Sequence, residues 1–134
     1  MPANRIATFA PPWPDPPATV KIGPLTYTIS RFDPREANER ALYGFVRNAD
    51  QAIWIDLQHG PERGALALLH ELLHAVADVH PIELGDKDKE ESIVQALTTV
   101  LGASLRDSPE VWLWILERLG LDLERRAQER RTPA

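Results

Sequence analysis

The chain has 134 residues and a formal net charge of −5 at pH 7. Its length suits one compact domain, and its acidic balance argues against a protein that binds nucleic acid or anionic membranes through a basic surface. The sequence contains no cysteine, so neither disulfides nor thiolate metal ligands are available to it.

Prolines crowd the start of the chain, at positions 2, 11, 12, 14, 16 and 17. This density excludes a helix or an interior strand and predicts a disordered Pro-rich arm over residues 1–18. The same region lacks a basic segment followed by an apolar core, and no apolar run reaches about 18 residues without a charge. We therefore expect a cytoplasmic protein with no membrane partner and no nucleic-acid partner.

Short strands are predicted between residues 19 and 56. Val20–Ile22 and Leu25–Ile29 alternate apolar and polar residues on either side of a Gly-Pro pair, which predicts a β-hairpin or a bent strand. Ala41–Val46 and Ala52–Asp56 have the pattern of two more strands, joined by a turn-rich tetrapeptide. We expect three or four short strands in all, paired antiparallel.

Three helices are predicted in the second half of the chain. Pro61 suits the first turn of a helix, and the residue before Pro81 is expected to end that helix because it avoids helical geometry. Pro109 follows a capping sequence and suits the first turn of another helix. The expected helices span Pro61–Val79, about Lys89–Leu105 and about Pro109–Leu119.

The predicted helices and strands define one domain over residues 19–120. After Leu123 the chain is mostly charged, and its arginines alternate with acidic residues. Such a segment is typical of a solvated surface, so residues 121–134 are predicted to form a charged, flexible C-terminal tail.

Inside the first predicted helix, the segment Leu69–Ala75 contains the pattern HExxH. Residues four apart on a helix lie one turn above each other, so His70 and His74 can direct two imidazoles at one point, as zinc ligands do in this motif. Glu71 lies about 100° further round the helix and can reach a water at the metal. The competing interpretation is a buried helix that carries two histidines by chance. The residues around the two histidines and Glu71 are aliphatic, however. Buried polar groups need partners, and a metal would supply them.

A catalytic zinc needs a third protein ligand, and three residues compete for this role. His80 follows His74 by six residues, as the last histidine does in the pattern HExxHxxGxxH, but Ala77 stands in place of the glycine. The second predicted helix offers Glu90 and Glu91, which would give the gluzincin arrangement. On that helix Glu90 projects near the middle of the apolar stripe, whereas Glu91 lies at its edge. Periodicity taken alone therefore favours Glu90.

A family resemblance is carried by five segments between about Val20 and Trp114. They are Lys21–Tyr27, Ile53–Ile55, Leu69–Ala75, Glu90–Leu97 and Leu105–Pro109. Together they resemble small phage- and prophage-associated metallopeptidase-like proteins, which are loosely related to the ImmA/IrrE group. In such relatives a glutamate two or three residues before an Ile-Val pair is the third zinc ligand, and the register here implies Glu91. On this basis the predicted ligands of zinc (Zn²⁺) are His70, His74 and Glu91.

The resemblance implies a minimal zincin-like domain of the α+β class, in which the strands pack on the HExxH helix and two further helices. It also implies a hydrolase, a gluzincin-like zinc metalloendopeptidase whose substrate is a protein such as a regulator in a phage or mobile-element switch. In this mechanism Glu71 takes a proton from a water that zinc activates and passes it to the leaving amine. An edge strand, Ala52–Asp56 or Ala41–Val46, would hold the peptide by strand addition.

Three further residues have two interpretations each. His59 and Tyr43 are either oxyanion helpers or ordinary loop and sheet residues, and Asp78 either orients a ligand or faces solvent.

Two other functions stay open beside the peptidase. The chain is then either a zinc-stabilised protein-binding module with little or no hydrolytic activity, or a helical domain without metal. A peptidase of this size is either active alone or latent until a partner binds.

Overall fold

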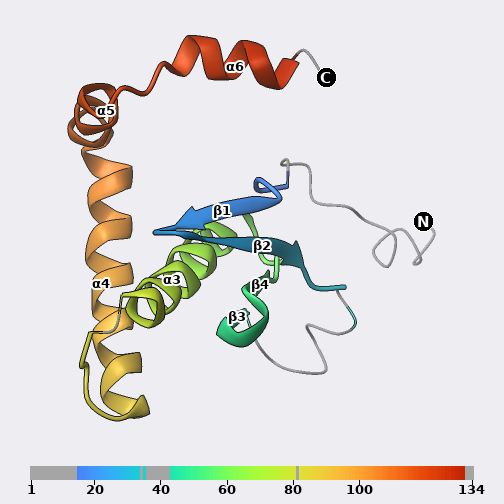
Figure 1. Cartoon of the computed structure of the whole chain (residues 1–134), viewed down its shortest axis with the longest axis vertical. Coiled ribbons are helices and arrows are strands. Elements are labelled where there is room, and N and C mark those ends of the chain that lie inside the picture. Colours follow the sequence, from blue (N-terminus) through green and yellow to red (C-terminus); the bar gives the residue numbers. More distant parts are fainter. Residues whose placement is uncertain (1–14, 34, 36–42, 81, 132–134) are drawn as a thin grey trace, which may run out of the picture. The chain divides into compact units, whose positions relative to one another are not determined.

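The computed structural model describes residues 15–33, 35, 43–80 and 82–131. These residues form an α+β structure with one four-stranded mixed sheet and the helices α3 to α6 (Figure 1). The chain divides into two compact units, with the boundary between Thr99 and Val100. The predicted arm lies almost entirely outside the described residues, and the predicted extents of arm, domain and tail stay predictions.

Strands β1 (Thr19–Ile22) and β2 (Leu25–Arg31) form the predicted β-hairpin. They pair antiparallel along the full length of β1. Gly23 begins the connecting turn with a φ of +58°, a backbone conformation that glycine adopts without steric cost. The hairpin prediction is confirmed.

Strands β3 (Gly44–Arg47) and β4 (Ala52–Ile55) confirm the next two predicted strands, except that residues 41 and 42 lie outside the described part of the chain. One turn of 3-10 helix, η1 (Asn48–Asp50), connects them, and Gln51 leaves that turn with a φ of 50°. β3 and β4 pair antiparallel.

The prediction of an all-antiparallel sheet is wrong, because β4 pairs with β2 in parallel. The strand order is β1-β2-β4-β3, so β4 occupies the interior of the sheet and β3 forms an edge. Alternation of apolar and polar residues indicates which face of a strand is buried, and it carries no information on strand direction. The sequence pattern therefore locates the strands without specifying how they pair.

The core lies between one face of the sheet and α3 (Pro61–Val79), which Figure 1 shows against that sheet. Ile53 and Ile55, alternate residues of β4, are fully buried, as is Tyr27 of β2. Ala75 of α3 is fully buried against them. Full burial of an isoleucine side chain stabilises the fold by about 1.5–3 kcal/mol. Packing of α3 on the sheet is thus the main support of the HExxH segment.

α3 begins and ends at the predicted residues. His80 follows it in an extended conformation with a φ of −115°, as a residue before proline prefers. Near the start of the helix, a Cβ at Gly64 would lie only 2.8 Å from Cδ2 of Leu57. The absence of a side chain at Gly64 therefore allows α3 to pack closely against the segment that follows β4.

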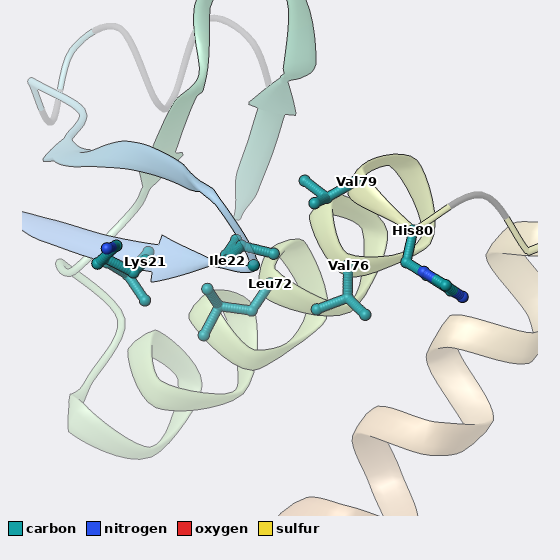
Figure 2. Close-up of a pocket in the computed structure, with 8 residues that line it drawn as sticks. Lys21, Ile22, Leu72, Val76, Val79 and His80 are labelled. Carbon is teal, nitrogen blue, oxygen red and sulfur yellow. The ribbon is translucent and has the colours of Figure 1, made fainter.

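An apolar pocket of about 400 Å³ lies between β1 and α3 (Figure 2). Ile22 lines it from the strand, and Leu72, Val76 and Val79 line it from the helix. His80 lines the same pocket at the end of α3.

α4 spans Lys87–Asp107 and α5 spans Pro109–Arg118, close to the predictions. α4 begins before the predicted start because Asp86 caps it: one carboxylate oxygen accepts a hydrogen bond from the backbone N–H of Lys89 at 2.8 Å. No helix in the described part of the chain is long and apolar enough to cross a membrane.

α6 (Leu123–Arg131) lies in the segment that was predicted as a flexible tail, and this helix was not predicted. Asp122 caps it by accepting a hydrogen bond from the backbone N–H of Arg125 at 2.9 Å. The helix is rich in Glu, Arg, Gln and Ala, which are all good helix formers. The high charge of the segment is compatible with a helix exposed to solvent.

Candidate metal centre

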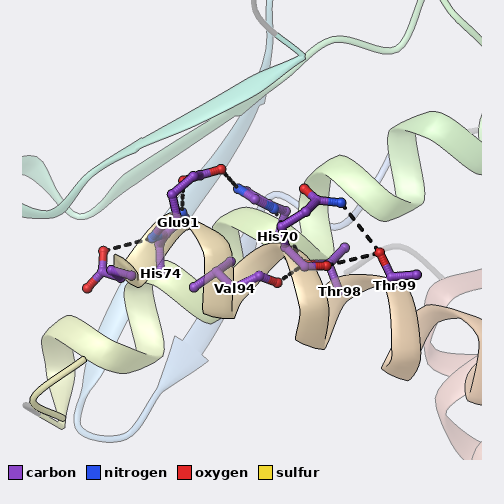
Figure 3. Close-up of polar contacts among 8 residues, drawn as sticks. His70, His74, Glu91, Val94, Thr98 and Thr99 are labelled. Carbon is purple, nitrogen blue, oxygen red and sulfur yellow. Dashed lines mark hydrogen bonds and ion pairs between the residues drawn. The ribbon is translucent and has the colours of Figure 1, made fainter. Parts of the chain in front are cut away.

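Two histidines one turn apart on α3 face the start of α4 (Figure 3). The ring centroids of His70 and His74 lie 4.9 Å apart, and the Nε2 atoms of both rings lie 2.8 Å from the carboxylate of Glu91. Each ring contacts a different oxygen, Oε1 for His70 and Oε2 for His74. One ligand atom from each residue lies within 4.8 Å of the others, so this triad could hold a metal ion.

The second nitrogen of each ring contacts a residue that can hold the ring in the tautomer required for metal binding. Nδ1 of His74 lies 3.0 Å from Oε2 of Glu90. A carboxylate is a hydrogen-bond acceptor, so Nδ1 of His74 is suited to donate its proton to Glu90 when Nε2 binds a metal. In that tautomer of the neutral ring, Nε2 has a lone pair that faces Glu91. Glu90 therefore orients His74 from the side opposite to the triad.

Thr98 can hold His70 in the same tautomer. The hydroxyl of Thr98 is buried and donates its hydrogen to the carbonyl oxygen of Val94 at 2.7 Å (Figure 3). It can therefore only accept a hydrogen bond from Nδ1 of His70, which lies 3.4 Å away. Nε2 of the neutral His70 ring is left with a lone pair, as in His74.

With both imidazoles in this tautomer, a cation fits between the rings and Glu91. A carboxylate oxygen and a nitrogen lone pair are both acceptors, and they approach to 2.8 Å only when a proton or a metal ion lies between them. Tetrahedral zinc bound at about 2.0–2.1 Å places its ligand atoms about 3.3 Å apart. The side chain of Glu91 is 57% exposed, which leaves it room for so small a shift. The donor set and its spacing fit a metal ion.

Glu71 is the buried acid of the site, with only 8% of its surface exposed. Burial raises the pKa of its carboxyl group to about 7, an effect that the charge of His74 opposes and the charge of Glu91 reinforces. A carboxyl group that titrates near neutral pH can accept a proton in one step and return it in the next.

The edge strand β3 passes close to this acid at Gly44. A Cβ at Gly44 would lie 3.2 Å from Cγ of Glu71 and 3.0 Å from the carbonyl oxygen of Trp54. The strand can approach Glu71 so closely only because it carries no side chain there. The edge strand of the sheet, as the described residues form it, and the buried acid are thus neighbours.

Two other candidates from the sequence lie elsewhere. His80 is exposed at the end of α3, lines the apolar pocket and does not belong to the metal-binding triad found among the described residues. Asp78 is exposed too. Burial raises the pKa of Tyr27, and the negative charge of Asp78 raises it further.

Tyr43 and His59 lie together near the start of α3. Their rings meet edge to face, with centroids 5.6 Å apart. Nε2 of His59 lies 3.1 Å from the buried carboxylate of Asp56, and the hydroxyl of Tyr43 accepts a hydrogen bond from Arg63 at 3.2 Å. Their role as oxyanion helpers stays a prediction. The sequence analysis missed Arg63, although it precedes His70 by seven residues and therefore lies on the same helix face.

Comparison with known proteins found no matching family model, no matching curated protein and no matching solved structure. The resemblance to phage-associated metallopeptidases therefore stays a prediction, and function has to be inferred from the geometry of the triad and its surroundings.

Proposed function

We propose that the protein is a zinc-dependent metallopeptidase with a minimal zincin-like fold, and that it hydrolyses a peptide bond of a protein substrate. The observation that carries this proposal is the convergence of His70, His74 and Glu91 beside the buried acid Glu71. Two imidazoles and one carboxylate are a typical ligand set of catalytic zinc, which leaves one position for water or substrate.

When bound to this triad, zinc would make a water acidic enough to lose a proton near neutral pH and would polarise the carbonyl group of the substrate. Glu71 accepts the proton of the attacking water at its carboxylate and then donates it to the nitrogen of the leaving amine. Glu90 and Thr98 hold the two imidazoles in the tautomer that ligation requires.

Strand β3 is the best candidate for binding the peptide. Of the two strands considered from the sequence, only β3 is an edge, since β4 lies inside the sheet. The carbonyl oxygen of Tyr43 accepts a hydrogen bond from the N–H of Asp56, and antiparallel pairing alternates such bonded pairs along the strand. Gly44 and Val46 therefore direct their N–H and C=O groups away from β4, where an extended peptide can add as a further strand.

The narrower proposal of a regulator in a phage or mobile-element switch as substrate rests on the family resemblance alone. The proximity of β3 to Glu71 supports an extended segment of a protein as the substrate, whatever its biological context.

The Glu71→Gln variant tests the peptidase proposal. Zinc binding should survive because Glu71 is not in the triad, whereas cleavage of a peptide library should fall by about 10²–10⁴-fold. Zinc content is measured by elemental analysis and cleavage by mass spectrometry. Unchanged turnover in Glu71→Gln would refute the mechanism.

The position of β3 at the edge of the sheet, among the described residues, favours one alternative, a zinc-stabilised protein-binding module with little or no hydrolysis. This alternative predicts that zinc raises the melting temperature, that the wild-type protein cleaves no peptide, and that Glu71→Gln binds its partner as the wild type does. A comparison of the wild-type protein with Glu71→Gln therefore distinguishes the two functions.

A further inference from the structure

Arg63 is a cation held beside the start of β3. Its Nη1 donates a hydrogen bond to the hydroxyl of Tyr43 at 3.2 Å, and its Cζ lies 5.3 Å from the centre of the same ring. Tyr43 immediately precedes β3, and the N–H of Asp56 donates a hydrogen bond to its backbone carbonyl, which ties Tyr43 to the sheet. The guanidinium group is thus oriented before any ligand arrives.

The guanidinium group of Arg63 keeps most of its hydrogen-bonding capacity. It has five N–H donors, and the hydroxyl of Tyr43 accepts from one of them. Within the described residues its partners are the hydroxyl and the ring of Tyr43, and no carboxylate forms an ion pair with it. A planar cation with free donors is suited to bind a carboxylate through two parallel hydrogen bonds.

Arg63 is also aligned with the metal triad. It precedes His70 by seven residues, close to two helical turns, so the two side chains leave α3 on the same face. Ala67 lies between them on that face and has only a methyl group as its side chain. The rise from Arg63 to His70 is about 10 Å, a distance that an extended peptide covers in about three residues.

We propose that Arg63 is a specificity-determining residue, which binds a carboxylate of the substrate about three residues from the bond to be cleaved. The inference rests on the proposed function, because it places the reacting bond at the metal triad. The carboxylate belongs to a Glu or Asp side chain or to the C-terminus of the substrate, which present the same group. Tyr43 is the positioning residue that holds the guanidinium group beside β3.

Peptide binding tests this role without any need for hydrolysis. The zinc-loaded Glu71→Gln variant of the full chain is titrated with fluorescein-labelled eight-residue peptides that carry one Glu at successive positions, each matched by a peptide with Gln. At one or two adjacent positions, the Glu peptide should bind about tenfold more tightly than the Gln peptide. Adding Arg63→Gln should bring this ratio to about one. Equal binding of Glu and Gln peptides at every position, together with equal binding of peptides with a free and with an amidated C-terminus, would overturn the proposal.

Three matched variants separate binding by Arg63 from general effects of charge or folding. Arg63→Lys keeps the charge without the planar fork, and Tyr43→Phe keeps the ring without the hydroxyl, so both should retain a reduced preference for Glu. Arg118→Gln removes a guanidinium group that also lies over an aromatic ring, 4.7 Å from the centre of Trp114 in the second unit. It should leave the ratio unchanged, and loss of the preference in Arg118→Gln would contradict a specific role for Arg63.

The source of the carboxylate is identified with free and amidated peptides. Tighter binding of the free than of the amidated peptide, lost in Arg63→Gln, assigns the site to a terminal carboxylate. A preference for Glu over Gln that persists in amidated peptides assigns it to an acidic side chain. Cleavage by the wild-type protein is scored separately. A preference for acidic peptides without cleavage would contradict the peptidase proposal and support carboxylate binding by Arg63. Cleavage without that preference would support the peptidase proposal and contradict the role of Arg63.

Discussion

Glu90 and Glu91 are neighbours in the sequence and contact opposite sides of the histidine pair. Glu91 lies against Nε2 of both His70 and His74, while Glu90 lies against Nδ1 of His74 alone. Periodicity favoured Glu90, because it weighs only the direction in which a side chain leaves its helix. A glutamate has enough rotatable bonds to reach a site at the edge of the apolar stripe, so the choice between the two residues depended on the packing of α4 on α3.

The two glutamates should differ in their effect on zinc affinity. Glu91→Gln replaces a charged residue of the proposed ligand set, whereas Glu90→Gln only weakens the support of His74, for which about a 10–100-fold loss is typical. The affinity of Glu91→Gln should therefore fall further than that of Glu90→Gln, as measured by competition with a zinc chelator. Glu83→Gln, at an exposed position before α4, is the matched control. A greater loss in Glu90→Gln than in Glu91→Gln would reverse the assignment.

Glu71 should make the metal-free protein less stable as the pH rises from about 4.5 to 7. The unfolded chain loses the proton of Glu71 near the ordinary pKa of 4.5, whereas the folded, metal-free protein keeps it up to a pKa of about 7. Between these values the unfolded state binds fewer protons, so the free energy of unfolding decreases with pH, by on the order of 3 kcal/mol in total.

The Glu71→Gln variant isolates this effect, because a neutral amide has no charge to bury. With chelator present, its melting temperature should exceed that of the wild type at pH 8 by several degrees more than at pH 5. The same difference at both pH values would show that burial of Glu71 is not the cause.

The three residues of the HExxH motif could be predicted because their geometry is local. Helical spacing alone places His70 and His74 one turn apart, and the structure brings both rings to one carboxylate. Thr98 could not be predicted in the same way, because its part in orienting His70 depends on contact between two helices that are distant in the sequence.

Among the elements, strand β3 is the one whose packing bears most directly on the site. Gly44→Ala would place a methyl group 3.2 Å from Cγ of Glu71 and 3.0 Å from a backbone oxygen that cannot easily move. We expect a loss of about 1–3 kcal/mol in the free energy of unfolding, measured by urea denaturation. Displacement of Glu71 should also lower kcat by about 10–100-fold.

Zinc affinity is the internal control for Gly44→Ala, since the triad belongs to α3 and α4 and not to β3. It should stay within about threefold of the wild-type value, which is small beside the 10–100-fold loss expected when a ligand's support is removed. A variant with normal kcat would show that Glu71 tolerates the added methyl group, and would weaken the proposed link between edge strand and acid.

The elements themselves were predictable to different degrees. α3 has strong local signals at both ends, Pro61 and Pro81, and its predicted bounds are confirmed. The parallel pairing of β2 with β4 was missed, because apolar alternation is the same for either direction. α6 was missed because its charge was given more weight than its capping residue, Asp122.

For the molecule as a whole, every member of the candidate site belongs to the first of the two units. The triad, Glu71, β3 and Arg63 all precede the boundary at Thr99 and Val100. This division was not foreseen from the sequence, because α4 continues across the boundary without a break in its pattern.

Zinc should therefore protect the first unit selectively. Binding at 100 times the dissociation constant stabilises a folded protein by about 2.7 kcal/mol. Hydrogen exchange followed by mass spectrometry should show slower exchange in residues 61–79 and 87–99 when zinc is added, and little change in residues 109–131. Uniform slowing across the chain would show that the two units respond to the metal together.

The ligands also lie close together along the chain, since Glu91 follows His74 by seventeen residues. Bringing ligands together over so short a loop costs little chain entropy, so an ion can bind there tightly and stabilise the folded state by binding it in preference to the unfolded chain. Because changes of 1–2 kcal/mol can alter the cellular level of a protein several-fold, the abundance of this chain would track the supply of zinc. When zinc is scarce, fewer molecules would have an occupied metal site, and proteolysis of the less stable metal-free form would also lower the number of intact molecules.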